Sequence, residues 1–177
     1  PYQFPEKLIP LVILKCLRRE SIPLYGDGQH IRDWLHVEDH CEALYTVLCK
    51  GRVGQTYNIA ADQQWTNLEL VKKLCVIVEQ ELEALAPVSP AASASVRPSG
   101  AVRLQDLITF VSDRRGHDRR YAINTRRIRE QLGWQPQQDF ESGLRATVQW
   151  YLANRDWWQA ILAGQYNLQR MGCGDAR

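Results

Sequence analysis

The chain has 177 residues, of which 45% are hydrophobic and 24% are charged, and its formal net charge is +2. This length and composition are typical of a folded domain with a sizeable core, and they exclude a globally disordered chain. The small net charge argues against nucleic-acid binding, and no segment approaches the roughly 18 apolar residues of a membrane span.

The five cysteines are scattered without a Cys-x-x-Cys pair, and no signal peptide is visible. An odd number of thiols without a regular framework is typical of reduced cysteines in the cytosol. We therefore expect a cytoplasmic protein that has neither a disulfide scaffold nor a zinc site and does not contact a membrane.

The N-terminal part of the chain predicts a helix, a strand and a turn. The helix opens at Phe4-Pro5-Glu6, because proline is tolerated in a first turn, and it frays at the basic pair Arg18-Arg19. Ser21–Tyr25 is a short predicted strand, and the two glycines of Gly26-Asp27-Gly28 allow a turn with positive φ. Ile31–Leu35 is predicted to be extended again.

Two further helices flank a predicted strand. The first helix begins at Val37-Glu38-Asp39 and ends at Lys50-Gly51, a basic residue followed by a glycine cap. Its expected inward-facing stripe consists of Ala43, Leu44, Val47 and Leu48. Gln55–Ala60 is the predicted strand, and Thr66-Asn67-Leu68-Glu69 is a capping box that starts a helix running to about Glu83.

The segment 84–104 is rich in alanine, proline and serine, and we expect it to form a flexible loop. After it come a strand, an arginine-dense loop, an extended segment, two helices and a short final helix: Leu107–Val111, Ser112–Arg120, Tyr121–Ile123, Arg126–Leu132, Phe140–Asn154 and Trp157–Leu162. Asn124 or Thr125 is expected to cap the first of these helices, and Asp139 the second. Residues 165–177 are expected to form a frayed tail.

The alternation of strands and helices predicts the α/β class. About four short strands are fewer than a sheet usually has, which suggests that further strands lie upstream.

Arg32 lies beside the bulky apolar residues Ile31 and Trp34. A buried guanidinium without an anionic partner is very costly, so we expect a partner. One interpretation is a structural ion pair with Asp33 or Asp39. The other is a planar fork that binds a phosphate or a carboxylate group.

A second charged cluster, Asp113–Arg120, directly follows a predicted strand. Ligands of open α/β sheets bind outside the carboxyl ends of strands, so this loop is a candidate binding site as well as a solvated face. A diphosphate held between Arg114 and Arg32 would explain two arginine-bearing loops at two strand ends. Tyr25 is either half-buried core or a ring face for a planar base, and Asn58 is either a turn residue or a donor to a sugar hydroxyl.

Metal and nucleotide-fingerprint motifs are not found. His36 and His40 lie four residues apart, but no third ligand type is near them, so we expect no metal site. The sequence contains no Gly-x-Ser-x-Gly, no Gly-x-x-x-x-Gly-Lys and no Gly-x-Gly-x-x-Gly. Gly26-Asp27-Gly28 is not a dinucleotide fingerprint, because no helix follows it directly.

Five segments of the sequence stand out together: PYQFPEKLIPLVI, PLYGDGQHIRDWLHVEDHCEAL, TYNIA, DRRGHDRRYAI and LGWQPQQDFESGLRATVQWYL. They resemble the dTDP-glucose 4,6-dehydratase family, which are NAD-dependent, extended short-chain dehydrogenases/reductases acting on a nucleotide sugar. The resemblance runs from Pro1 to about Trp158. It implies the C-terminal part of such an enzyme, with the last strands and helices of a Rossmann-like sheet and a small α/β substrate-binding subdomain. Residues 1–164 would form this nucleotide-sugar-binding portion.

The resemblance also implies which residues contact the nucleotide sugar: Lys7, Leu8, Pro23, Leu24, Tyr25, Arg32, Asn58, Asp113, Arg114, Gly116 and His117. Arg32 corresponds to the diphosphate-binding arginine of the family, and the last four residues correspond to a second nucleotide-binding loop. Arg115 stands where the family usually has proline, so this loop is expected to be more basic and less rigid.

The family's glycine-rich NAD fingerprint, its Thr-Asp-Glu motif and its Tyr-x-x-x-Lys pair lie upstream of the matched start and are absent from these 177 residues. The resemblance implies that NAD oxidises C4 of the glucosyl ring, water is eliminated across C5–C6 and the hydride returns to C6. We therefore expect no catalytic and no cofactor-binding residue in this chain, and NAD bound by a missing N-terminal half. The isolated fragment should be inactive and its parent a homodimer.

Two other interpretations stay open. The chain could be a fragment of a UDP-sugar epimerase or decarboxylase of the same superfamily, which would accept a different nucleotide. It could also be a stand-alone, non-catalytic binding module, which would unfold cooperatively on its own.

Overall fold

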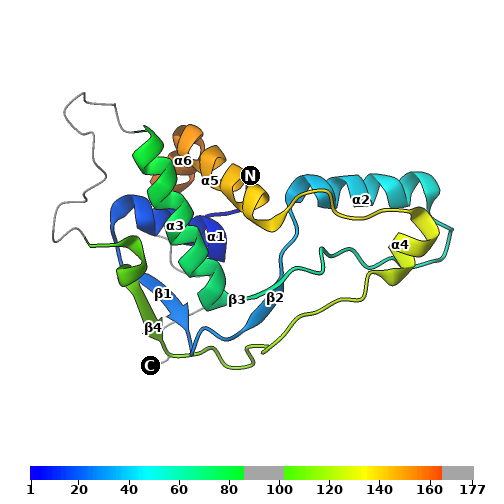
Figure 1. Ribbon diagram of the computed structural model, residues 1–177, viewed down its shortest axis with the longest axis horizontal. Helices are drawn as coiled ribbons and strands as arrows, with labels where there is room; N and C mark the ends of the chain where they lie inside the picture. The colour runs from blue at the N-terminus through cyan, green and yellow to red at the C-terminus, as the bar shows by residue number, and fades with distance from the viewer. Residues whose placement is uncertain (86–101, 165–177) are drawn as a thin grey trace. The chain divides into compact units, whose positions relative to one another are not determined.

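The computed structural model describes residues 1–85 and 102–164 (Figure 1). The elements follow one another as α1 Leu8–Arg18, β1 Ile22–Tyr25, β2 Ile31–Asp33, α2 Val37–Lys50, β3 Gln64–Thr66, α3 Asn67–Leu85, a 3₁₀ turn Leu104–Leu107, β4 Ile108–Val111, α4 Arg126–Leu132, α5 Phe140–Ala153 and α6 Arg155–Ala163. Strands and helices share the chain, as the α/β prediction requires. The predicted tail 165–177, and residues 86–101 of the predicted loop, lie outside the described residues.

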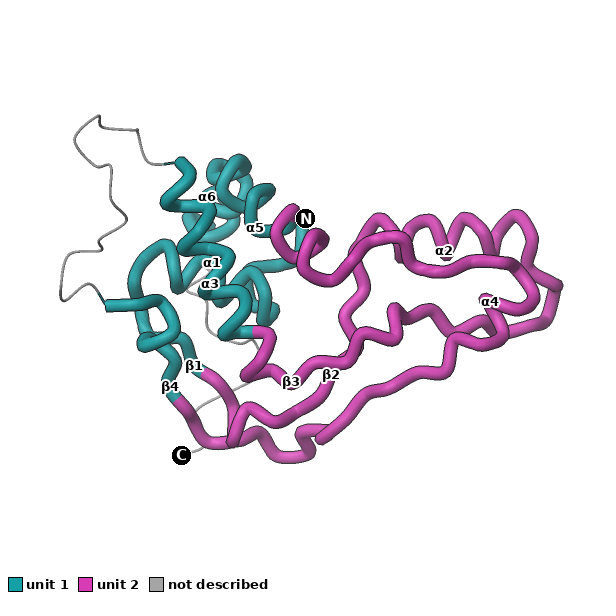
Figure 2. The backbone as a smooth tube through the Cα atoms, viewed as in Figure 1, with its two compact units in different colours: residues 1–23, 71–109, 147–177 teal, residues 24–70, 110–146 magenta. Residues whose placement is uncertain are grey.

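The chain divides into two compact units (Figure 2). Unit 1 comprises Pro1–Pro23, Val71–Thr109 and Thr147–Arg177, and unit 2 comprises Leu24–Leu70 and Phe110–Ala146. The described strands form two sheets of two strands each, β1 with β4 and β2 with β3. No helix in the described part of the chain is long and apolar enough to cross a membrane.

The core of unit 1 is built from the apolar faces of its helices. α1 buries Ile13 and Leu14 completely, as its periodicity predicts. Its Cys16 lies with Sγ 3.8 Å from Sγ of Cys75 on α3, and the hydrogen bond between the two thiols, together with burial, raises the pKa of Cys16. The buried Tyr151 of α5 donates its hydroxyl hydrogen to Gln3 O at 2.6 Å. These contacts hold the N-terminal segment on the helical core.

The core of unit 2 contains one apolar cluster and one buried acid. Ala43 of α2 packs with Ile128, Leu132 and Trp134, which come from α4 and the turn after it. Asp39, only 3% exposed, accepts the backbone N–H groups of residues 137 and 138 at 3.0 Å each. A buried carboxylate that accepts two backbone donors is satisfied without a cation.

The predicted helix starts are confirmed where a side chain caps them. The Thr66 N–H donates to Glu69 Oε2 at 2.9 Å, and the Glu69 N–H donates to Thr66 Oγ1 at 3.1 Å, which completes the capping box. Asp139 Oδ2 accepts the N–H groups of residues 141 and 142 at the start of α5. Of the two candidates at α4, Asn124 is the side chain that caps, through the Arg126 N–H at 2.8 Å.

The predicted strand Gln55–Ala60 is wrong, because these residues form no ladder. Their polar groups pair with the segment around α4 instead. Arg127 Nη1 donates to Thr56 O at 3.0 Å, and Asn58 Nδ2 donates to Asn124 O at 3.2 Å. The Thr56 carbonyl therefore has a side-chain donor where a ladder would supply a backbone N–H.

The strand partner of β2 is β3, which runs antiparallel with Arg32 opposite Trp65. The predicted extended segment 121–123 forms no strand, and a single parallel bridge joins Ile31 to Arg120 just before it. Local sequence does not reveal these pairings, because they depend on residues more than thirty positions apart.

Two helix predictions also need correction. α1 begins at Leu8, not at Phe4, because Phe4 O accepts the Lys7 N–H at 3.0 Å and closes a turn first. On α2, Ala43 is buried as expected, but Leu44 is 52% and Leu48 is 82% exposed. The apolar cluster of unit 2 meets α2 along the side that carries Ala43.

Candidate functional site

The loop Asp113–His117, which follows β4, is closed by its own first side chain. Asp113 Oδ1 accepts the Arg114 N–H at 2.8 Å and lies 2.7 Å from His117 Nδ1. The His117 N–H donates to Arg114 O at 3.3 Å, and Gly116 takes a φ of +67° in the turn between them. Gly116 therefore occupies a position that glycine adopts without strain.

The end of β1 contacts this loop. The Gly26 N–H donates to Val111 O at 2.9 Å, and Gly26 has a φ of +60°. A Cβ at Gly26 would lie 3.0 Å from Asp113 Oδ2, so a side chain at this position would crowd the carboxylate. Beside it, Arg114 Cζ lies 5.3 Å from the Tyr25 ring centroid.

The Tyr25 ring also contacts the His117 ring. The Tyr25 and His117 ring centroids are 6.4 Å apart, edge to face. The structure thus brings together four residues that the sequence predicted as nucleotide contacts: Tyr25, Asp113, Arg114 and His117. Leu24, a fifth, is buried, and its Cδ2 lies only 2.6 Å from where a Cβ at Gly28 would stand.

His30 is part of this cluster, and sequence reasoning missed it. It is 2% exposed, its Nε2 lies 3.1 Å from Asp113 Oδ2, and its ring stacks on His117 with centroids 3.7 Å apart and planes 18° apart. A single histidine between a glycine turn and a strand carries no sequence pattern that would reveal this contact.

His30, Asp113 and His117 place three potential ligand atoms within 4.8 Å of one another. We assign no metal to them. The nitrogen lone pairs of an imidazole lie in the ring plane, and two stacked rings direct theirs along nearly parallel planes that do not meet at one ion. His36 and His40 belong to no group of three such ligands within residues 1–85 and 102–164.

Arg32 on β2 makes contacts with backbone carbonyls and an aromatic ring. Nη1 donates to Ile31 O at 2.7 Å and Nη2 donates to Asp118 O at 2.8 Å. Its Cζ lies 4.7 Å from the Tyr121 ring centroid. The Tyr121 hydroxyl donates to the Asp118 carboxylate, which raises the pKa of that hydroxyl. These contacts fix the position of a guanidinium that forms no ion pair with a carboxylate within residues 1–85 and 102–164.

The alternative of a structural ion pair for Arg32 is wrong. Asp33 accepts the backbone N–H groups of residues 61 and 62 at 3.0 Å each, and Asp39 is used by residues 137 and 138. Asp27 does bind an arginine: Arg119 Nη1 donates to Asp27 Oδ1 at 2.9 Å and to Asp27 Oδ2 at 3.1 Å. That hydrogen bond, with a second from a backbone N–H, lowers the pKa of Asp27.

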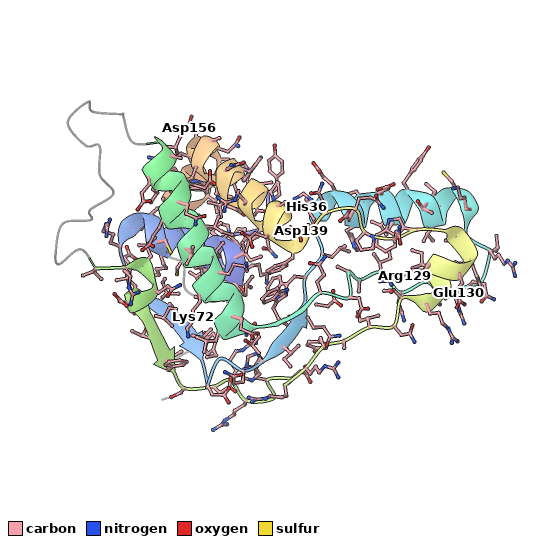
Figure 3. All side chains as sticks on the ribbon, viewed as in Figure 1. His36, Lys72, Arg129, Glu130, Asp139 and Asp156 are labelled. Carbon is pink, nitrogen blue, oxygen red and sulfur yellow. The ribbon has the colours of Figure 1, made fainter. Side chains whose placement is uncertain are left out.

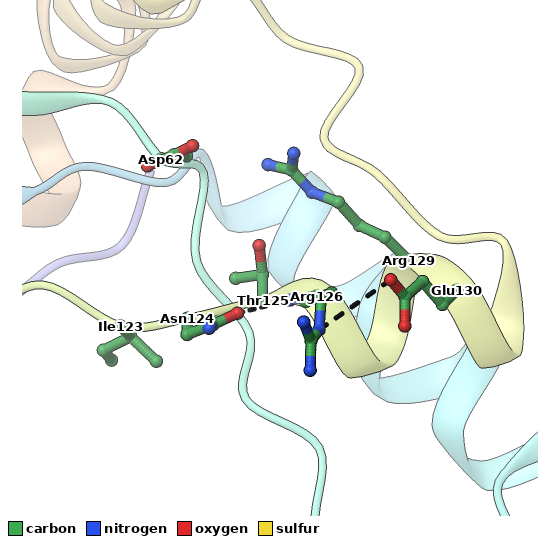
Figure 4. Close-up of a pocket in the computed structure, with 7 residues that line it drawn as sticks. All are labelled: Asp62, Ile123, Asn124, Thr125, Arg126, Arg129 and Glu130. Atoms are coloured by element: carbon green, nitrogen blue, oxygen red, sulfur yellow. Dashed lines mark hydrogen bonds and ion pairs between the residues drawn. The ribbon is translucent and has the colours of Figure 1, made fainter.

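Asn58 contacts a different segment of unit 2. Its Nδ2 donates to Asn124 O, and it lines a pocket of about 360 Å³ together with Thr56, Asn124, Arg126 and Arg127. A pocket of similar volume, about 360 Å³, lies around the start of α4 and includes Asp62, Arg126, Arg129 and Glu130 (Figure 4). Arg129 and Glu130 both project from α4 (Figure 3).

Three predicted contacts belong to unit 1. Lys7 precedes α1, is largely exposed and has Nζ 3.5 Å from Glu6 Oε1. Leu8 is the first residue of α1, and Pro23 lies in β1.

The residues present do not fit the pyrophosphate of NAD. Dinucleotide binding of this type uses a Gly-x-Gly-x-x-Gly turn between a strand and a helix. The 177 residues contain no such turn, and the Gly26–Gly28 turn leads into strand β2 instead. We therefore derive no hydride-transfer step from this chain.

Comparison with known proteins gives one family. The family model described as GDP-mannose 4,6 dehydratase matches residues 1–147. The dTDP-glucose 4,6-dehydratase of Neisseria meningitidis serogroup B is 54% identical over 174 residues, which are 98% of this chain and 46% of that protein.

Solved structures agree. The dTDP-glucose 4,6-dehydratase of Bacillus anthracis, in complex with NAD, superposes with a TM-score of 0.73 at 42% identity and covers 91% of this chain and 44% of its own. DesIV, the dTDP-glucose 4,6-dehydratase of Streptomyces venezuelae with NAD and TYD bound, gives a TM-score of 0.72 at 38% identity, with 91% and 43% covered.

The chain thus spans less than half the length of these relatives. The match nevertheless includes most of this chain, and the α/β fold is that of the short-chain dehydrogenase/reductase relatives. Since the family model covers residues 1–147 of 177, the chain belongs to the GDP-mannose 4,6 dehydratase family.

Proposed function

We propose that the chain supplies the nucleotide-sugar-binding portion of a dTDP-glucose 4,6-dehydratase. The whole enzyme would convert dTDP-glucose to dTDP-4-keto-6-deoxyglucose and water. Two relatives named as dTDP-glucose 4,6-dehydratases support this choice of substrate. The chain is 54% identical to the one from Neisseria meningitidis and 42% identical to the one from Bacillus anthracis.

The observation that carries the proposal is an arginine N–H group that has no hydrogen-bond acceptor among the described residues, on a guanidinium that lies beside an aromatic ring. Arg114 Nε is buried without a hydrogen-bond partner within residues 1–85 and 102–164, and the guanidinium lies over Tyr25. Arg32 donates to two carbonyl oxygens and, in the described part of the chain, to no carboxylate. A diphosphate would supply the acceptor that Arg114 Nε lacks and an anionic partner for both guanidinium groups.

In this proposal the base lies along Leu24 and Tyr25, and the diphosphate meets Arg32 and the Asp113–His117 loop. Asn58 would contact the nucleotide, and Lys7, Leu8 and Pro23 would border the sugar and the base. Arg115 would add positive charge at the same loop.

We propose that catalysis and NAD binding need residues that the relatives have outside the matched region, which is more than half of their length. The 177-residue chain should then bind nucleotide without turning it over. Incubation of the chain with NAD and dTDP-glucose should give no 4-keto-6-deoxy product, and product formation would refute this part of the proposal.

Calorimetric titration of the chain with thymidine diphosphate, uridine diphosphate and thymidine tests the binding role. We expect thymidine diphosphate to bind, and thymidine to bind far more weakly because it lacks the groups that the arginines hold. Preference for uridine diphosphate would favour an epimerase or a decarboxylase acting on UDP-sugars. A chain that melts cooperatively but binds none of the three would favour a non-catalytic module of another kind.

We further propose a cytoplasmic, homodimeric whole protein that binds neither nucleic acid nor membrane. The unpaired thiols of Cys16, Cys41, Cys49 and Cys75 agree with a reducing compartment. Sedimentation of the whole protein would test the dimer.

A further inference from the structure

We propose that His30 is a positioning residue, which holds the Asp113–His117 loop in the conformation that meets the nucleotide. This inference rests on the proposed function, because the loop is the proposed nucleotide contact. His30 itself would touch no substrate. It acts through the Asp113 carboxylate and the His117 ring.

His30 has the rigidity that such a role needs. Its carbonyl accepts the Asn67 N–H at 2.9 Å, and its neighbour Ile31 exchanges backbone hydrogen bonds with the 119–121 segment at 2.9 and 3.1 Å. The His30 side chain is 3% exposed, whereas the Asp113 side chain is 39% exposed. A buried, doubly anchored residue therefore contacts an exposed loop.

The polar contact of His30 is directed entirely at the loop. Nε2 lies 3.1 Å from Asp113 Oδ2, whereas Nδ1 is buried without a partner in the described residues. Because Asp113 accepts and cannot donate when ionised, the hydrogen of a neutral His30 belongs on Nε2. A histidine present for packing alone would have no reason to direct its donor at this carboxylate.

Through Asp113, His30 affects both Arg114 and His117, two of the proposed ligand contacts. Asp113 Oδ2 is used by His30, which leaves Oδ1 for the Arg114 N–H and for His117 Nδ1. The His30 ring also lies flat against the His117 ring at 3.7 Å. Loss of the His30 donor would leave Asp113 Oδ2 without this partner, so the carboxylate that closes the loop would be less restrained.

Two substitutions separate the donor from the ring. His30→Phe keeps a flat ring for the stack and removes the donor, and it also removes the unpartnered Nδ1, so folding should survive. His30→Gln keeps an N–H donor at a similar reach and removes the ring. His40→Phe on α2 is the matched control, because His40 is exposed and distant in sequence from the loop.

The first measurement needs no ligand. Hydrogen exchange of the Arg114 and His117 amides, followed by NMR in the 177-residue chain, reports the two hydrogen bonds that close the loop. We expect exchange to quicken at least about tenfold in His30→Phe, which corresponds to about 1.4 kcal/mol. His30→Gln and His40→Phe should exchange like the unaltered chain.

The second measurement is thymidine diphosphate affinity of the same proteins. We expect at least about a tenfold loss for His30→Phe and recovery in His30→Gln. Unchanged exchange in His30→Phe, unchanged affinity despite faster exchange, or failure of His30→Gln to restore the loop would each overturn the inference. If the unaltered chain binds no nucleotide while His30→Phe loosens the loop, the proposed function fails and the positioning of the loop by His30 stands.

Discussion

Replacement of Arg32 by alanine gives the sharpest test of the proposed diphosphate contact in unit 2. The guanidinium donates to Ile31 O at 2.7 Å and to Asp118 O at 2.8 Å, so its loss removes two charged-donor hydrogen bonds. For a half-buried side chain we expect a stability loss of about 1–3 kcal/mol. If a diphosphate is its anionic partner, the binding loss should be larger, about 2–5 kcal/mol, or about thirtyfold and more in Kd.

Two variants make the comparison specific. Arg32→Lys keeps the charge and loses the planar fork, so its affinity for thymidine diphosphate should fall between those of the unaltered chain and Arg32→Ala. Arg119→Ala removes the same charge from an exposed arginine that pairs with Asp27, with 61% of the Arg119 side chain exposed. It should change affinity little, because exposed charges are screened by salt.

Isothermal titration at a temperature where circular dichroism shows each variant fully folded measures these losses. Equal losses for Arg32→Ala and Arg119→Ala would mean that only overall charge matters. An Arg32→Ala chain that is destabilised but binds as tightly as the unaltered chain would make Arg32 a structural clamp for the Asp118–Tyr121 segment, and the diphosphate role would be refuted.

Two further predictions concern stability. Gly28→Ala should be markedly more destabilising in a urea titration than Gly54→Ala: both glycines have positive φ, at +71° and +80°, but a Cβ at Gly28 would lie 2.6 Å from Leu24 Cδ2 whereas Gly54 has nothing within 4 Å. Equal losses would mean that backbone conformation alone sets the cost. Hydrogen bonds from the side chain and backbone N–H of Thr66 lower the pKa of Glu69 in the folded chain. The ionised Glu69 therefore contributes its full stabilisation of the fold above the pKa that it has in the unfolded chain, and this stabilisation is lost as the pH falls through its lower pKa in the folded chain. Glu69→Gln should therefore remove part of the acid dependence of the thermal midpoint between about pH 5 and pH 3. An unchanged acid limb would refute this.

Sequence alone determined the features that depend on neighbouring residues. The capping box Thr66–Glu69, the Asp139 cap and the glycine turn at Gly26–Gly28 are all local, because each bonds or bends within three or four residues. The resemblance carried by the five quoted segments likewise gave the family, since it depends on the order of residues in the chain. It also predicted Tyr25, Asp113, Arg114 and His117 as nucleotide contacts, and the fold places these four residues together.

Only the tertiary structure decided what depends on distant partners. Gln55–Ala60 has a strand-like sequence, yet Thr56 O accepts from the Arg127 side chain, Asn58 Nδ2 donates to Asn124 O, and β3 pairs with β2 instead. Leu44 and Leu48 fit a helical stripe, but nothing in their spacing says which side of α2 meets the apolar cluster. His30 is the clearest case. Its role depends on a carboxylate 83 residues away, at 3.1 Å in space, and a lone histidine in a sequence does not indicate which loop it will hold.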